Sequence, residues 1–156
     1  MASGTIPGKI SNTSRSGDYT FWVEWKSSRI SGTNSSSVTA TAYVKSNGGW
    51  DSDTVNSNWT QTITINGSKA SRDIRVNIKR DKTRVTLISH TVTVKHDNDG
   101  SKTITISANC KLGSTNYSSF PYSPGTGTAS ESVDLDKIPR VPPTAASITF
   151  SANRCV

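Results

Sequence analysis

Cysteine is scarce in this chain of 156 residues, which has only Cys110 and Cys155. Two thiols cannot form the disulfide framework of a small secreted domain. Cys110 continues an alternating apolar segment, which favours a buried free thiol. Cys155 lies beside the end of the chain, where order is usually lost. A domain of this length can bury about 70% of its unfolded surface, so we expect a self-sufficient core.

Long apolar runs are also missing, so we expect no membrane span. The start of the sequence, Met1–Thr5, has no basic segment followed by an apolar stretch, so we expect no signal peptide. The protein would then be made in a cytoplasm. If it acts outside a cell, it would leave by lysis or within a particle.

Apolar residues make up only 31% of the chain, and charged residues 19%. The apolar residues are ordered rather than scattered, which argues against disorder. Hydroxyl residues are abundant instead, with 26 Ser and 21 Thr. Threonine fits a pleated surface, and Ser, Asn and Gly fit turns, so this composition favours sheet.

Alternating apolar residues predict strands, and two short sequences predict hairpin turns, Asn66-Gly67 and Asp99-Gly100. A change of parity near Ile88–Ser89 predicts a bulge or a break between two strands. The predicted strands are residues 19–25, 38–44, 59–65, 72–78, 85–87, 92–96, 104–110 and 131–135, and the long loops are 27–37, 46–58 and 111–130.

This spacing is typical of an all-β fold, an antiparallel β-sandwich of seven to eight strands, immunoglobulin-like or related. We expect one sandwich domain over residues 1–140. Residues 141–156 would form a proline-containing linker with a short C-terminal strand, or the start of a further domain.

Two motifs carry a resemblance to a known family. The segment Val94–Ile104 resembles a hairpin with the pattern His-x-x-Asp-Gly-x-Lys-Thr, and Leu135–Arg140 resembles the ending Leu-x-x-Ile-Pro-Arg. Together they are similar to siphophage structural proteins of Gram-positive hosts, which belong to the tail tip, baseplate or fibres. The resemblance covers about residues 1–140. It implies a sandwich fold, a place in the virion and no catalytic residues.

Catalytic and metal-binding patterns are not found. The segment His96–Gly100 offers two carboxylates and an amide without a distal Glu, which fits a turn better than a calcium loop. His90 and His96 supply half of a zinc site, so we expect structural or surface roles. No Ser/His/Asp arrangement, phosphate loop or carboxylate pair stands out. We therefore expect no enzyme activity, no metal and no cofactor.

Positive charge is concentrated in one stretch of a chain whose net charge is +7. Most of these side chains would project from one hairpin, either protecting an edge strand or contacting a polyanion such as teichoic acid. The stretch contains Lys69, Arg72, Arg75, Lys79, Arg80, Lys82 and Arg84.

Aromatic residues form a second candidate surface. Two of them alternate away from the predicted core, and the others lie in loops. They could pack against other subunits or stack on sugar rings. The set comprises Trp22, Tyr43, Trp50, Tyr117, Phe120 and Tyr122.

Three functions remain open. The first is a virion structural protein that assembles with itself or with other virion proteins. The second is a module that binds a host cell-wall polysaccharide. The third is a charge-driven nucleic-acid binder, which is the weakest because no nucleic-acid-binding motif interleaves the basic residues.

Overall fold

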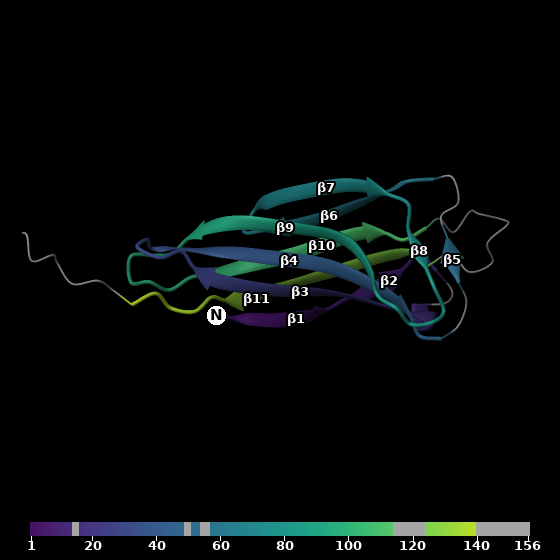
Figure 1. Cartoon of the computed structure of the whole chain (residues 1–156), viewed down its shortest axis with the longest axis horizontal. Helices are drawn as coiled ribbons and strands as arrows, with labels where there is room; N and C mark the ends of the chain where they lie inside the picture. Colours follow the sequence, from purple (N-terminus) through teal and green to yellow (C-terminus); the bar gives the residue numbers. More distant parts are fainter. Residues whose placement is uncertain (14–15, 49–50, 54–56, 114–123, 140–156) are drawn as a thin grey trace, which may run out of the picture.

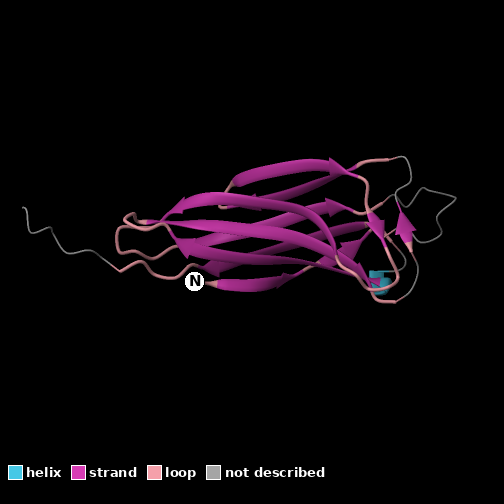
Figure 2. Ribbon diagram, viewed as in Figure 1, coloured by secondary structure: helices cyan, strands magenta, loops and turns pink. Residues whose placement is uncertain are grey.

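The computed structural model describes residues 1–13, 16–48, 51–53, 57–113 and 124–139. Its long strands run along the long axis of the molecule in two layers (Figures 1 and 2). Two antiparallel sheets enclose the core, so the expected β-sandwich is confirmed. In the described part of the chain, eight strands have five or more residues, and the single helical element is a 3-10 turn, Ser16–Asp18.

The first sheet has four strands in the order β1-β3-β4-β9. Their bounds are β1 Ser3–Pro7, β3 Tyr19–Arg29, β4 Ser35–Ser46 and β9 Val85–Lys95.

The second sheet has five strands in the order β2-β11-β10-β6-β7. Their bounds are β2 Lys9–Ser11, β11 Thr126–Asp134, β10 Thr103–Lys111, β6 Trp59–Ile65 and β7 Ser68–Ile74. A small third sheet pairs β5 (Ser52–Asp53) with β8 (Asn77–Ile78).

Strict alternation along the strands builds the core. In β3 the odd-numbered residues from Tyr19 to Trp25 are buried, and in β4 the even-numbered residues from Val38 to Val44 are buried. Small alanines in β4 lie opposite the large side chains of β3, as in the pair Trp25 and Ala40. Full burial of an aliphatic side chain contributes about 1.5–3 kcal/mol, so the two inner faces carry most of the stability.

The N-terminal strand changes sheets at Gly8. β1 pairs with β3 in the first sheet, and β2 pairs with β11 in the second. The Gly8 amide donates to the carbonyl of Phe21 at 3.1 Å, and a Cβ on Gly8 would lie 2.6 Å from that same oxygen. Only glycine can approach so closely, so this residue lets one strand join the two layers. β1 and β2 are therefore short edge strands of two different sheets.

The first predicted hairpin turn is confirmed, and the second is wrong. Asn66 and Gly67 have φ values of 49° and 82°, which suit the tight turn between β6 and β7. Asp99 and Gly100 do lie in a turn, but it links β9 in the first sheet to β10 in the second. The sequence shows a turn without showing which sheet each flanking strand joins.

Several predicted boundaries move. The loop expected at 27–37 shrinks, because β3 runs to Arg29 and β4 begins at Ser35. The last strand begins at Thr126, not Glu131, because Ser, Thr and Gly continue it along β10. The strand expected at 72–78 is divided into β7 and β8, and Ile74 is only half-buried.

The parity change in β9 is a bulge. Ala42 pairs with Ile88 and Tyr43 with Thr86, so the extra residue is Leu87, just before the predicted position. Both Leu87 and Ile88 are buried, which explains why the pattern changes phase there.

Candidate functional site

The outer face of the four-stranded sheet carries the aromatic residues that the sequence placed away from the core. Trp22 pairs with Pro7 on one side and with Tyr43 on the other. These three side chains form a transverse line across the sheet. We call them, with Arg84, the aromatic row. Trp22 and Tyr43 are only half-buried, because alternation along the strands points their side chains away from the core, whereas their neighbours Phe21 and Val44 point into it.

The aromatic row is held by ring stacking and one cation. The rings of Trp22 and Tyr43 are stacked with centroids 5.5 Å apart and planes inclined by 29°. The guanidinium of Arg84 lies 4.2 Å from the centroid of Tyr43 and donates to Glu24 Oε2 at 2.8 Å. Stacking contributes about 0.5–1.5 kcal/mol and an exposed cation–π contact about 0.5–1 kcal/mol. The Arg84–Glu24 ion pair is half exposed, so it adds little to stability.

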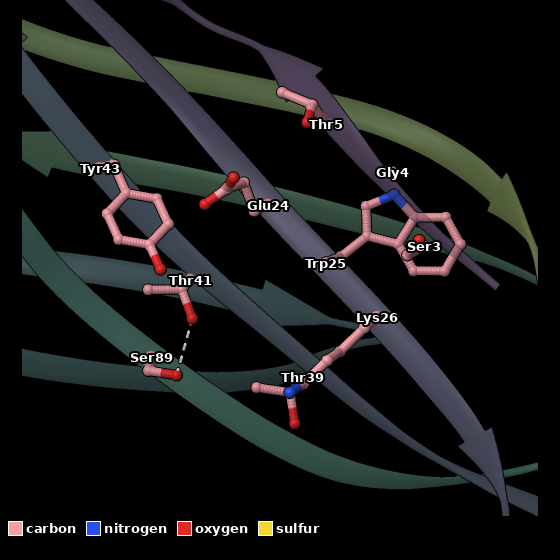
Figure 3. A pocket seen from close by; sticks show the side chains of 10 residues that line it. All are labelled: Ser3, Gly4, Thr5, Glu24, Trp25, Lys26, Thr39, Thr41, Tyr43 and Ser89. Carbon is pink, nitrogen blue, oxygen red and sulfur yellow. Dashed lines mark hydrogen bonds between the residues drawn. The ribbon is translucent and has the colours of Figure 1, made fainter. Parts of the chain in front are cut away.

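A hydroxyl-lined hollow of about 580 Å³ lies beside the aromatic row (Figure 3). The hydroxyls of Thr41 and Ser89 are hydrogen-bonded at 2.9 Å, and those of Thr39 and Thr91 at 2.8 Å. The Tyr43 ring lies at one side of the hollow (Figure 3). The other lining residues are Ser3, Gly4, Thr5, Glu24, Trp25 and Lys26.

A second hollow of about 380 Å³ lies near the opposite end of the sheet. Trp22 lines it together with Pro7, Thr20 and Lys45, and the main chain at Gly8 and Phe21 completes it. The aromatic row therefore lies between two hollows, and each contains a lysine. The sequence identified Trp22 and Tyr43, but Pro7 and Lys45 are found only through the strand register.

The basic stretch does not project from one hairpin as expected. Lys69 and Arg72 lie on β7, at the edge of the five-stranded sheet. Lys82, with φ of 70°, lies in the connection between β8 and β9, and Arg84 reaches across to the aromatic row. Arg75, Lys79 and Arg80 lie between these positions. The break after Ile74 distributes the charges, which the sequence pattern did not show.

Four aromatic candidates lie outside the described residues. They are Trp50, Tyr117, Phe120 and Tyr122. The predicted linker and strand at 141–156, with Cys155, lie outside them too.

Comparison with known protein families matches residues 9–151 to the family described as "Siphovirus protein of unknown function (DUF859)". The chain belongs to this family. The match passes Arg140, at which the sequence resemblance was expected to end. No curated protein and no solved structure matches the chain. In the part that the structure describes, no helix is long and apolar enough to span a membrane.

The two motifs behind the resemblance meet at one end of this siphovirus protein. Buried His96 bonds Ser36 Oγ through Nε2 and the Gly100 carbonyl through Nδ1, both at 2.8 Å. Gly100 has φ of 86°, and a Cβ there would overlap the carbonyl of Ile138. The Ile138 amide donates back to the Gly100 carbonyl at 2.9 Å. His96 therefore has a structural role, as expected, and the second motif fastens the chain after β11 onto the turn.

In the acidic turn beside His96, the Asp99 carboxylate is hydrogen-bonded by a residue of the turn itself. Asp99 accepts hydrogen bonds from the hydroxyl and the amide of Ser101, which lower the pKa of this carboxyl. No group of three or more metal-ligating side chains occurs among the described residues.

The buried thiol is confirmed. Cys110 is fully buried, and desolvation raises its pKa to about 12. A thiol that stays protonated is a poor nucleophile.

Proposed function

We propose that this siphovirus protein is a non-enzymatic virion component of the tail tip, baseplate or fibre, which contributes to tail assembly and host attachment. Membership of a siphovirus family carries the proposal. A rigid sandwich with two open outer faces supports it, because such a unit can be stacked between neighbours. The buried His96 side chain and the exposed Asp99 side chain are both engaged in hydrogen bonds within the chain, which leaves the sheet faces and edges for contacts.

The test is the composition of purified phage particles. Mass spectrometry should find the chain in the particles, and antibody labelling should place it at the distal end of the tail. Particles made without the chain should lack distal tail structure or fail to adsorb to host cells. Its absence from purified particles, or labelling confined to the capsid, would contradict the proposal.

A second candidate function is carbohydrate binding at the aromatic row. The observation that favours it is the position of Trp22 and Tyr43 between two hollows lined by hydroxyls and lysines. Aromatic faces stack on sugar rings, and hydroxyls exchange hydrogen bonds with them. Lys45 and Lys26 would attract a polymer that carries phosphate.

Purified host cell walls provide the test for this candidate. Wild-type protein should sediment with the walls, Trp22→Ala should lose at least about tenfold in affinity, equivalent to about 1.4 kcal/mol, and Trp22→Phe should keep most of it. Thr62→Ala, on the outer face of the other sheet, is the matched control. Unchanged binding by Trp22→Ala would exclude the aromatic row. Affinity that falls steeply with salt would indicate a phosphate-bearing polymer, and salt-independent affinity a neutral glycan.

Charge-driven binding of nucleic acid has less support. The basic side chains are spread from β7 to the aromatic row, and Arg84 is already paired with Glu24.

A further inference from the structure

The edges of the two sheets differ in how they are protected against pairing with another strand. Natural proteins protect edges with short strands, proline, bulges or charges that point inward. β1 is five residues long and ends at Pro7, which has no amide hydrogen. β2 is shorter still. These two edges are poor templates for a further strand.

Both remaining edges of the five-stranded sheet carry an inward charge. On β7, Arg72 lies opposite the buried Gln61, on the core side of the strand, yet it is exposed. On β11, beyond the three residues that β2 covers, Glu131 lies opposite the buried Ile106 and is also exposed. A partner strand would have to bury each of these charges, which is costly.

The edge of β9 is less protected over the seven residues from Ser89 to Lys95. Its bulge is at Leu87, and from Ile88 to Lys95 the register with β4 is continuous. Between Ser89 and Val94 the strand has no proline, glycine, Asp, Glu, Lys or Arg. Its one ionisable residue on the core side is His90, which is half-buried and hydrogen-bonds Ser68 of β7 at 3.1 Å. Within the described part of the chain, no hydrogen bond reaches its backbone from the side opposite β4.

The hydrogen-bonding pattern shows which groups of β9 are open. The His96 amide donates to the Asn34 carbonyl at 2.8 Å, so the even-numbered residues of β9 bond toward β4. Amides and carbonyls alternate in direction along a strand, so the odd-numbered ones point outward. The close pairing of the Thr39 and Thr91 hydroxyls fits this assignment, since side chains approach most closely in non-hydrogen-bonded pairs. The open backbone groups belong to Ser89, Thr91, Thr93 and Lys95.

We propose that two copies of this chain pair antiparallel through β9, with Val92 opposite Val92 of the second copy, which joins two four-stranded sheets into one. In this register Thr91 faces Thr93 of the second copy, and Ser89 faces Lys95. All four open residues are then hydrogen-bonded, and no like charges face each other. Centring the pair on Thr91 would instead leave Lys95 against the bulge.

A second copy fits this edge because the two strands are self-complementary. A two-fold contact uses the same surface twice, so one less protected edge is enough. The half-buried Val92 would gain a valine neighbour, and outward Thr91 and Thr93 would form cross-strand hydroxyl pairs. The two aromatic rows would lie on the same side of the joined sheet, where they could bind one polymer together. This inference deepens the proposed assembly role, because it identifies the edge of β9 as a surface through which copies of the chain assemble.

Sedimentation velocity at micromolar concentration tests the pairing. Wild-type protein should be a dimer. Val92→Lys places a charge on the core side of the edge and should abolish the dimer, whereas Ala70→Lys makes the same kind of change on β7 and should leave the dimer intact. Thermal unfolding verifies that both variants are folded. Thr91→Pro is a second variant, because it removes an outward amide that has no partner in the monomer.

Cysteine crosslinking tests the register. In a chain with Cys155→Ser, Val92→Cys should form an intermolecular disulfide on mild oxidation, because non-hydrogen-bonded pairs bring side chains closest. Thr93→Cys, which would face Thr91 of the second copy rather than itself, should crosslink far less.

Monomeric wild-type protein throughout the micromolar range would overturn the inference, as would association that survives Val92→Lys and Thr91→Pro. A dimer without the Val92→Cys crosslink would overturn the register. The outcome is separate from the proposed function. A chain that dimerises through β9 but is absent from virions would contradict only the function, and a virion protein that is monomeric would contradict only the pairing.

Discussion

The two outer faces of the sandwich have the same architecture and different chemistry. The four-stranded sheet presents the aromatic row between two hollows. The five-stranded sheet presents hydroxyl and amide side chains across its centre, where Thr62 lies between Ser71 and Asn109. Both faces follow from alternation over one shared core. Because the shared core is built from inward residues, its packing constrains the outer positions less than the inner ones.

The largest effects should come from the inner faces, and they should be alike in both sheets. Ile88→Ala under the four-stranded sheet and Ile106→Ala under the five-stranded sheet each remove a buried side chain. Each should lower the free energy of unfolding by about 2–5 kcal/mol in urea titrations. A negligible cost on one side would show that its sheet is not part of the shared core.

The next effect separates the outer faces. Trp22→Ala removes the stacked partner of Tyr43 and should destabilise the fold by about 0.5–1.5 kcal/mol beyond the area that it exposes. Thr62→Ala should change the free energy of unfolding by less than about 0.5 kcal/mol. Equal costs at the two positions would remove the distinction between the faces.

Alkaline pH should weaken the five-stranded side of the core. Cys110 has a folded pKa raised to about 12 from 9.0, so it contributes stability below pH 9 that is lost as pH rises toward 12. Cys110→Ala should reduce this alkaline loss, measured by urea unfolding across that range. At neutral pH the native thiol should resist alkylation, and rapid labelling would contradict its burial.

The smallest effect concerns the Arg84–Glu24 pair. A double-mutant cycle with Arg84→Ala and Glu24→Ala should give a coupling energy between 0 and about 1 kcal/mol, which decreases with salt because both groups are half exposed. A coupling well above that range would mean that the pair organises the aromatic row more strongly than its exposure suggests.

The sequence by itself determined the class of fold and the inner faces. Strict alternation in Tyr19–Trp25 and Val38–Val44 could be assigned to strands because burial on one side of a pleated strand has a period of two. It also placed Trp22 and Tyr43 outward and Cys110 inward. The sequence resemblance to siphophage proteins agrees with the siphovirus family that the chain matches.

Only the tertiary structure decided which strands are neighbours. Alternation shows which side chains share a face but not which strand lies alongside. The pattern therefore predicts a hairpin at Gly100 and one hairpin for the basic stretch, and the strand order contradicts both. The strand arrangement places Arg84 over the ring of Tyr43, 41 positions away in the sequence, and hydrogen-bonds Ile138 to Gly100. The less protected edge of β9 is a property of strand order as well, because an edge exists only once the sheet is assembled.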